Sequence, residues 1–292
     1  MKMNELMSKA DVLLEALPYI QQFHGADILV KFGGSAMEEP SVTASVLRDI
    51  AFMKYAGMNP IIVHGGGKAI SAELARQEIP TKFINGLRYT CERTIKVVDD
   101  VLHNVVNANL VASLRSFGVD ACPVSGKDVL RARKITTTDA ATGEKLDLGF
   151  VGEVVNVDVN QIHWVMARGQ VPVLTPLACD MSGNVYNINA DMAACVIASQ
   201  LKVQKLVFLS DKPGVLRNPD DDDSLISTIH TTEIDALAKE GVISGGMLPK
   251  LKSAAEALDK GVSKVHLNDG RLKHSLLLEF FTDKGIGTQI IK

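Results

Sequence analysis

The chain has 292 residues, of which 46% are hydrophobic, 22% charged and 5% aromatic, and its formal net charge is −3. This length allows two lobes with cores of their own, and the composition is that of an ordinary soluble globular protein. Without a basic stripe we expect neither nucleic acid nor a membrane as partner. No run approaches the roughly 18 apolar residues of a membrane-spanning helix, and acidic residues in the first apolar segment exclude a secretory signal. We expect a cytoplasmic protein.

The cysteines and histidines show no metal-binding spacing. The four cysteines lie far apart without a C-x-x-C pair, and the seven histidines form no metal-binding pair. We therefore expect buried free thiols and no metal site built by protein side chains.

The chain begins with an amphipathic segment over residues 4–23, in which apolar residues recur at helical spacing, including Leu6, Leu13, Leu14 and Leu17. We predict a helix there, which Pro18 should kink or interrupt.

From residue 27 onward, short apolar runs alternate with longer amphipathic stretches. The apolar runs predict strands over residues 28–32, 60–64, 171–174, 205–210, 262–267 and 288–290. The amphipathic stretches predict helices over residues 42–56, 69–77, 92–117, 190–201, 232–240 and 250–260. This alternation predicts an α/β fold with a largely parallel sheet and helices on both faces.

The middle of the chain, residues 119–159, has a different pattern. Turn residues at 139–143 and 148–152 separate short β-type runs, which predict antiparallel hairpins beside the main sheet. Further on, the acidic run at 220–223 predicts a solvated loop. We place a lobe boundary near residue 200, so that residues 25–200 form an N-terminal lobe, residues 201–292 a C-terminal lobe, and residues 1–24 a separate helix.

Three glycine-rich segments indicate phosphate chemistry. They are KFGGS at 31–35 and HGGGK at 64–68, each at the end of a predicted strand, and GGMLPK at 245–250. Glycine amides at a strand end, followed by a helix N-terminus, bind phosphate. Two of the three are clearly paired with a lysine, and phosphoryl transfer is catalysed chiefly by positioning and positive charge. The pattern suggests a kinase.

Each motif also has a purely structural interpretation. HGGGK matches neither a P-loop nor a dinucleotide fingerprint, because Ile62, Ala69 and Ile70 replace the required residues. It is either a bare anion-binding turn or a tight turn with structural glycines. Lys31 and Lys250 either face a ligand crevice at the sheet edge or extend to solvent.

Three further sites carry two interpretations. Asn189 is a plausible N-cap, and Asp191 in the first turn either interacts with the helix dipole or orients two catalytic lysines. Arg88 either clamps a carboxylate bidentately or lies on the surface. The segment SDKPGV at 210–215 is either a nucleotide-facing loop or a plain turn.

Together, the motifs at residues 31–34, 63–67, 86–88, 187–191 and 245–250 resemble those of the amino acid kinase family, and the resemblance runs from Asp27 to the C-terminus. It implies an open αβα sandwich whose N-terminal lobe binds N-acetyl-L-glutamate and whose C-terminal lobe binds ATP, with Mg²⁺ held mainly by the nucleotide. The implied reaction is phosphorylation of the substrate's side-chain carboxylate, in arginine biosynthesis. A carboxylate with a pKa of about 4.3 is ionised at pH 7 and needs no general base.

The resemblance assigns residues to roles. Lys31 and Lys250 would stabilise the transferring phosphoryl group, and Asp191 would organise them. Substrate contacts would come from Gly34, Gly66, Gly67, Arg88 and Asn187. Nucleotide contacts would come from Gly33, Asp211, Gly214, Val215, Leu216, Gly246, Met247 and Leu251, although the loop 211–214 departs in detail from the usual family sequence.

The two ends of the chain resemble the arginine-inhibited, hexameric members of the family. That resemblance implies a homo-oligomer built as a trimer of dimers, and an L-arginine site lined by Tyr19, His266, Glu279 and Gly285. The alternative is a terminal helix that covers the sheet edge and leaves Glu279 solvated. A PII-type signalling protein is a conceivable further partner that no motif indicates.

Other functions stay open. A related carboxylate kinase would act on aspartate, glutamate or an amino-modified aminoadipate. A carbamate kinase is disfavoured by Arg88, which suits an amino-acid carboxylate. A non-catalytic amino-acid sensor is disfavoured because both lysines and Asp191 are present.

Overall fold

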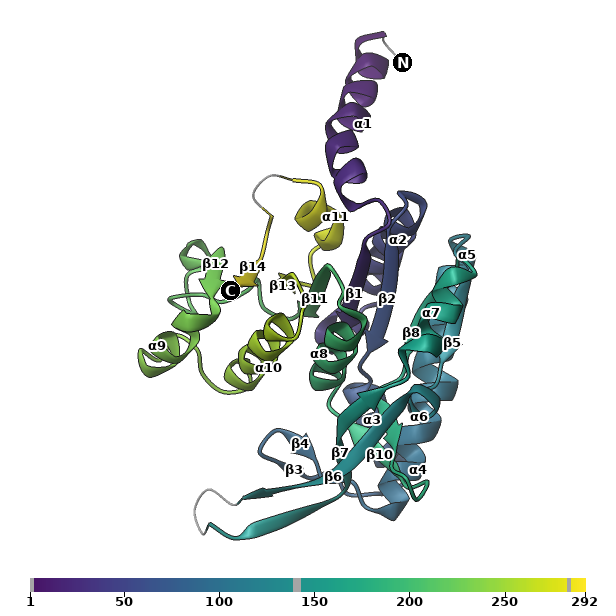
Figure 1. Ribbon diagram of the computed structural model, residues 1–292, viewed down its shortest axis with the longest axis vertical. Coiled ribbons are helices and arrows are strands. Elements are labelled where there is room, and N and C mark those ends of the chain that lie inside the picture. The colour runs from purple at the N-terminus through teal and green to yellow at the C-terminus, as the bar shows by residue number, and fades with distance from the viewer. Residues whose placement is uncertain (1–2, 139–142, 283–284) are drawn as a thin grey trace.

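The computed structural model describes residues 3–138, 143–282 and 285–292. Within them, the central sheet has eight strands in the order β12-β14-β13-β11-β1-β2-β8-β5, and all neighbours run parallel except β13 and β14. Helices flank the sheet on both sides (Figure 1). This confirms the predicted αβα arrangement with a mainly parallel sheet.

Most strands of this sheet lie where the apolar runs predict them. Their bounds are β1 Asp27–Phe32, β2 Asn59–His64, β5 Ala121–Val124, β8 Val171–Leu174, β11 Lys205–Ser210, β12 Thr228–His230, β13 Lys264–Asp269 and β14 Thr288–Ile291. β5 lies in the segment 119–159 that predicts antiparallel hairpins beside the sheet, and that placement is wrong for β5, because it pairs parallel with β8 in the main sheet. β12 is not predicted, because a run of three residues gives no clear pattern.

Two hydrophobic clusters, one on each face of the sheet, hold the helices. The first cluster includes residues of α7 Val159–Ala167, α8 Ala190–Leu201, α9 Ile234–Lys239 and α10 Met247–Asp259. The second includes residues of α2 Pro40–Tyr55, α3 Gly67–Arg76, α4 Glu92–Asp100, α5 Ala108–Ser116 and α11 Ser275–Phe280. In β1, Leu29 belongs to the first cluster while Ile28 and Val30 belong to the second. Burial on both faces explains why the strand is apolar without alternation.

Short helical segments complete the connections: η1 Gly34–Met37, α6 Gly126–Val129, η3 Asp222–Ser224 and η4 Thr231–Glu233. The acidic run at residues 220–223 is exposed, as predicted. All four cysteines are free, but only Cys195 is buried; the expected burial of Cys91, Cys122 and Cys179 is wrong, since each is partly exposed.

A small barrel lies beside the main sheet. β6 Leu130–Thr138 and β7 Lys145–Val157 form an antiparallel hairpin, which confirms the predicted pairing. Of the turn predicted at 139–143, residues 139–142 lie outside the described residues. The hairpin joins β9 Leu177–Cys179 and β10 Val185–Ile188 in a closed barrel, next to a two-stranded ribbon of β3 Phe83–Ile84 and β4 Leu87–Arg88. The barrel brings Asn187 of β10 opposite Val151 of β7.

The helix predicted over residues 92–117 contains an unexpected element. Between α4 and α5 the chain forms a π-helical segment, η2 Val101–Asn107, without leaving the helix. Such wider turns are rare and occur often at functional sites. Nothing in the residue pattern predicts it.

The N-terminal helix α1 (Met3–Phe23) extends away from the rest of the molecule (Figure 1). It continues through Pro18, so the predicted interruption does not occur. An exposed helix tolerates this proline more easily, because water can bond the carbonyl left without a partner. Leu13, Leu14 and Leu17 are 71%, 64% and 43% exposed in the single chain. Among the described residues no helix is long and apolar enough to span a membrane.

Candidate active site

Two lysines from distant parts of the chain converge on one carboxylate. Nζ of Lys31, in β1, lies 2.9 Å from Oδ1 of Asp191, at the start of α8. Nζ of Lys250, in α10, lies 3.3 Å from Oδ2 of the same residue. The lysine side chains are only 11% and 15% exposed. The interpretation that these lysines extend to solvent is therefore wrong.

The local structure holds Asp191 in place and ionised. Asn189 is the N-cap of α8, as predicted, and its side chain accepts hydrogen bonds from the backbone N–H groups of Asp191 and Met192. Burial raises the pKa of Asp191, but the Lys31 and Lys250 ammonium groups outweigh it and hold that pKa below its usual value. The single negative charge of Asp191 neutralises only half of the positive charge of the two lysines.

Two glycine turns lie against one another beside these charges. Gly34 has φ +68°, which favours glycine, and the backbone N–H of Gly65 donates to the carbonyl of Phe32. A Cβ on Gly66 would lie 2.6 Å from Cδ2 of Leu102 in the π segment, so no larger residue fits there without a shift. Because α3 begins at Gly67, its first N–H groups lack intrahelical partners and are available to an anion.

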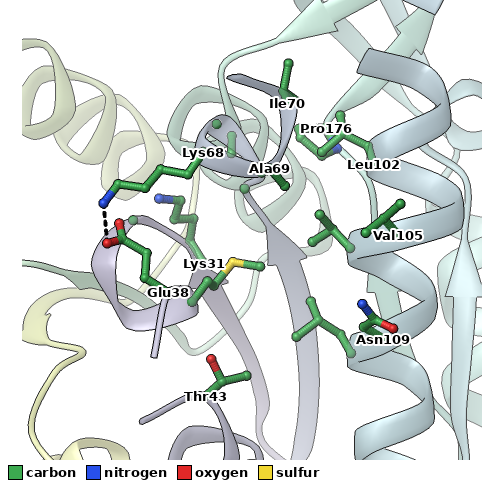
Figure 2. A pocket seen from close by; sticks show the side chains of 18 of the residues that line it. Lys31, Glu38, Thr43, Lys68, Ala69, Ile70, Leu102, Val105, Asn109 and Pro176 are labelled. Carbon is green, nitrogen blue, oxygen red and sulfur yellow. Dashed lines mark hydrogen bonds and ion pairs between the residues drawn. The ribbon is translucent and has the colours of Figure 1, made fainter. Parts of the chain in front are cut away.

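These elements surround a pocket of about 1040 Å³. Figure 2 shows Lys31, Glu38 and Lys68 on one side of it and Leu102 and Val105 of the π segment on the other. Lys68, the last residue of the HGGGK motif, pairs with Glu38, which no sequence motif predicts as part of the site. Of the predicted residues, Lys31, Gly34, Gly66, Gly67, Arg88, Asn187 and Asp211 line this pocket.

Arg88 is buried, so its interpretation as a surface residue is wrong. It is 7% exposed, and its Nη2 donates to the carbonyl of Gly67 and to Oγ of Ser71, each at 2.8 Å. The guanidinium lies over the ring of Phe83, with its Cζ 4.7 Å from the ring centroid. Its Nη1 is buried without a hydrogen-bond partner among the described residues, and burial lowers the pKa of Arg88. A ligand carboxylate in the pocket would satisfy that nitrogen.

Thr90 links Asn187 to Arg88. Nδ2 of Asn187 lies 3.3 Å from Oγ1 of Thr90, whose hydroxyl donates to the carbonyl of Arg88 at 2.8 Å. No sequence motif predicts a role for Thr90, Ser71 or Phe83. Ser71 lies four residues after Gly67, so helical spacing could have placed it in the site.

The predicted nucleotide-binding residues divide into two kinds. Asp211 is exposed in the pocket lining, and a Cβ on Gly246 would meet no atom within 4 Å. The side chains of Val215 and Leu251 are buried in the hydrophobic core. Their backbones are covered as well, since Val215 and Leu251 are only 2% and 0% exposed and the N–H of Val215 donates to Oγ1 of Thr288.

The residues expected to bind arginine lie together at the other end of the sheet. Nδ1 of His266 lies 2.6 Å from Oε1 of Glu279, and the N–H of Ile286 and the amide of Asn268 donate to Oε2 at 3.0 and 3.1 Å. Glu279 is 8% exposed, so its interpretation as a solvated residue is wrong. A Cβ on Gly285 would lie 2.9 Å from both Glu279 oxygens.

Tyr19 and an additional lysine border this cluster. The ring centroid of Tyr19 lies 6.3 Å from that of Phe281, just after α11. Lys205, which the sequence analysis did not single out, has its Nζ 4.6 Å from the ring centroid of Phe23 and 4.5 Å from that of Phe280. Burial lowers the pKa of Lys205 to about 8, although the charge of Glu279 opposes the shift.

Comparison with known proteins identifies the family. Residues 28–269 match the model of the amino acid kinase family. The chain belongs to this family. It is 47% identical to the acetylglutamate kinase of Brachyspira hyodysenteriae over 287 residues, which cover 97% of each chain. It is 44% identical to that of Aquifex aeolicus over 298 residues, covering 99% of each.

Solved structures of amino acid kinase fold resemble it as well. The N-acetylglutamate synthase of Neisseria gonorrhoeae, complexed with coenzyme A and N-acetyl-glutamate, matches with a TM-score of 0.84 and 28% identity. The match covers 97% of this chain but only 63% of the synthase. The carbamate kinase of Giardia matches with a TM-score of 0.67 at 14% identity, which shows a shared fold alone.

Proposed function

We propose that the protein transfers the γ-phosphoryl group of ATP to the side-chain carboxylate of N-acetyl-L-glutamate, forming N-acetyl-L-glutamyl 5-phosphate in arginine biosynthesis. The observation that carries the proposal is the convergence of Lys31 and Lys250 on Asp191 beside two glycine turns. Full-length relatives named acetylglutamate kinase at 44–47% identity support the choice of substrate.

The reaction joins two anions, so positive charge must offset their repulsion. The acceptor oxygen attacks the γ-phosphorus while the bond to the β-phosphate oxygen breaks, and ADP leaves with that electron pair. Lys31 and Lys250 carry two positive charges against the single negative charge of Asp191. The surplus charge stabilises the equatorial oxygens of the transferring group, and Arg88, with Asn187, holds the substrate's other carboxylate.

ATP and Mg²⁺ follow from membership of a kinase family. The described residues contain no group of three or more His, Cys, Asp or Glu side chains suited to a metal ion. Mg²⁺ is usually bound through one or two carboxylates plus substrate phosphates, and the exposed carboxylate of Asp211 in the pocket lining fits that donor set. When bound, the ion neutralises part of the phosphate charge. We propose that the nucleotide holds it and that the exposed residues within 211–216 and 246–251 contact the nucleotide.

A coupled assay of ADP release tests the proposal. The substrates to compare are N-acetylglutamate, glutamate, aspartate and N-acetyl-aminoadipate. We expect the highest kcat/KM for N-acetylglutamate. A higher value for any of the others would replace the proposed substrate, and no ADP release with any of them would favour a non-catalytic sensor.

We further propose that L-arginine inhibits the enzyme and that the chain forms a hexamer as a trimer of dimers. Glu279 is a buried carboxylate able to pair with a guanidinium, and the exposed leucines of α1 offer a surface to another subunit. A crystallised synthase of the same fold, 25% identical with a TM-score of 0.80, was complexed with L-arginine.

A further inference from the structure

His64 is a buried histidine next to the glycine turn, and the proposed reaction does not use it directly. It ends β2 and is fully buried. Its Nδ1 lies 2.7 Å from the carbonyl oxygen of Gly65, and its Nε2 lies 3.1 Å from Nδ2 of Asn107. Nδ2 of Asn107 also donates to the carbonyl of Val173 at 2.9 Å.

These contacts fix the protonation state of the ring. The carbonyl of Val173 can only accept, so the Asn107 atom next to it is the amide nitrogen, and the same nitrogen donates to Nε2 of His64. The carbonyl of Gly65 can also only accept, so Nδ1 carries the proton. The ring is therefore neutral, and burial lowers the pKa of His64 to about 4.

The bond to Gly65 sets the direction of a backbone donor. No described peptide bond is cis. In a planar trans peptide the carbonyl of Gly65 and the N–H of Gly66 point in opposite directions. Because His64 holds the carbonyl on the protein side, it directs the N–H of Gly66 the other way. Both Gly65 and Gly66 line the pocket that contains Lys31.

The π segment Val101–Asn107 holds both ends of this arrangement. Its last residue, Asn107, orients the imidazole of His64. Its second residue, Leu102, lies where a Cβ on Gly66 would be, which leaves room only for the bare backbone. The next carbonyls are also bonded, Gly66 to the N–H of Ile70 and Gly67 to Arg88.

We propose that His64 is a positioning residue, which the π segment locks with Nδ1 protonated so that the N–H of Gly66 points at the phosphoryl group in transfer. The proposal rests on the kinase activity proposed above. In this proposal the π segment positions the glycine turn through Asn107 and Leu102.

Kinetics of three variants test it. His64→Leu keeps the ring's approximate volume but cannot hold Gly65, so we expect kcat to fall about tenfold to a hundredfold, with the KM for ATP changed less than threefold. His64→Asn retains a short N–H donor and should recover a large part of kcat. The control is His103→Leu, in the same π segment, whose ring bonds Asp99 and Ser125 instead; it should keep kcat.

Two kinetic outcomes would overturn the proposal. One is a folded His64→Leu protein with wild-type kcat. The other is an equal loss in His103→Leu and His64→Leu, since that would indicate a general effect on the fold.

Nitrogen-15 NMR of the imidazole tests the same proposal without turnover. We expect a neutral ring with Nδ1 protonated from pH 5 to pH 8. In Asn107→Asp we expect Nε2 to gain a proton as well, because a carboxylate replaces the amide donor while the carbonyl of Gly65 still accepts from Nδ1. An Nε2-protonated or charged ring in the wild type would refute the inference. If the wild type phosphorylated no tested substrate, the proposed function would fail, and these spectra would still decide the state of His64.

Discussion

At the scale of single residues, the site depends on two ammonium groups that share one carboxylate. Lys31 and Lys250 are fixed before any nucleotide binds, since each is paired with Asp191 and largely buried. Charge that is already in position needs no reorganisation during the reaction. The two lysines should therefore contribute chiefly to kcat.

Lys31→Ala or Lys250→Ala should lower kcat about 10²–10³-fold with modest changes in KM, because charge matched to the transition state is lost. Lys→Arg at either position should also lower kcat, since a planar guanidinium cannot replace a compact ammonium group. The control is Lys252→Ala, two residues along α10, where the side chain is 58% exposed. Steady-state kinetics give the answer, and an unchanged kcat in both alanine variants would refute the site.

Arg88→Lys should raise the KM for N-acetylglutamate about tenfold or more, with a smaller change in the KM for ATP. In the wild type Nη2 of the guanidinium donates to Gly67 and Ser71, and Nη1 is left for the ligand. A lysine ammonium group cannot do both. Arg93→Lys on the exposed side of α4 is the matched control. Equal effects on both substrates would argue against a substrate clamp at Arg88.

The ion pairs of Lys31 and Lys250 with Asp191 also predict that the free energy of unfolding depends on pH. In the wild type the folded-state pKa of Asp191 is lowered. Its contribution to the free energy of unfolding is therefore present above the pKa of the unfolded chain, about 3.9, and is lost only as pH falls through the folded-state pKa. In a Lys31→Ala/Lys250→Ala variant, burial is unopposed and raises that pKa. The stability gap between the two proteins should shrink from pH 7 to pH 4 in urea unfolding; a constant gap would contradict this account.

At the scale of elements, α2 and α11 are joined by a buried polar contact. Asp49 in α2 is fully buried, and its Oδ1 lies 2.7 Å from Nδ1 of His274, just before α11. Burial raises the pKa of Asp49, although His274 opposes the shift. The N–H of His274 donates to Ser45, also in α2. These bonds fix where α11 begins, and α11 carries Glu279.

Asp49→Ala should destabilise the protein by about 1–3 kcal/mol, because His274 and nearby backbone donors lose a buried acceptor. Asp49→Asn keeps an acceptor oxygen without a buried charge and should cost much less. Chemical denaturation of the three proteins, with Asp100→Ala on the exposed side of α4 as control, gives the comparison. A larger loss for Asp49→Asn than for Asp49→Ala would reverse the argument.

Some elements are predictable from the sequence, and others are not. Strands such as β1 and β11 are buried on both faces, so their apolar runs are unambiguous. Glycine and lysine at the carboxyl ends of β1 and β2 predict the site, because parallel strands bring their carboxyl ends to one edge. The spacing of residues does not distinguish the π segment from an α-helix. The contact of His64 with Asn107 joins residues 43 positions apart, so both features are visible only in the folded structure. The barrel escaped prediction because β9 and β10 have only three and four residues.

At the scale of the whole molecule, α1 presents apolar side chains that the single chain does not cover. Deleting residues 1–24 should reduce the oligomer to a smaller species while leaving kcat without arginine within about threefold. Light scattering and assays with millimolar arginine test this together. We expect the wild type to be a hexamer inhibited by arginine. A hexameric, equally inhibited deletion protein would remove α1 from both roles.

The three charged residues of the centre stand at positions 31, 191 and 250, and β1, which carries the first, pairs with β11, which begins at Lys205. A growing polypeptide therefore cannot assemble this centre until residue 250 has left the ribosome. Recovery of activity after dilution from denaturant should therefore require both the pairing of β1 with β11 and the approach of Lys250 to Asp191.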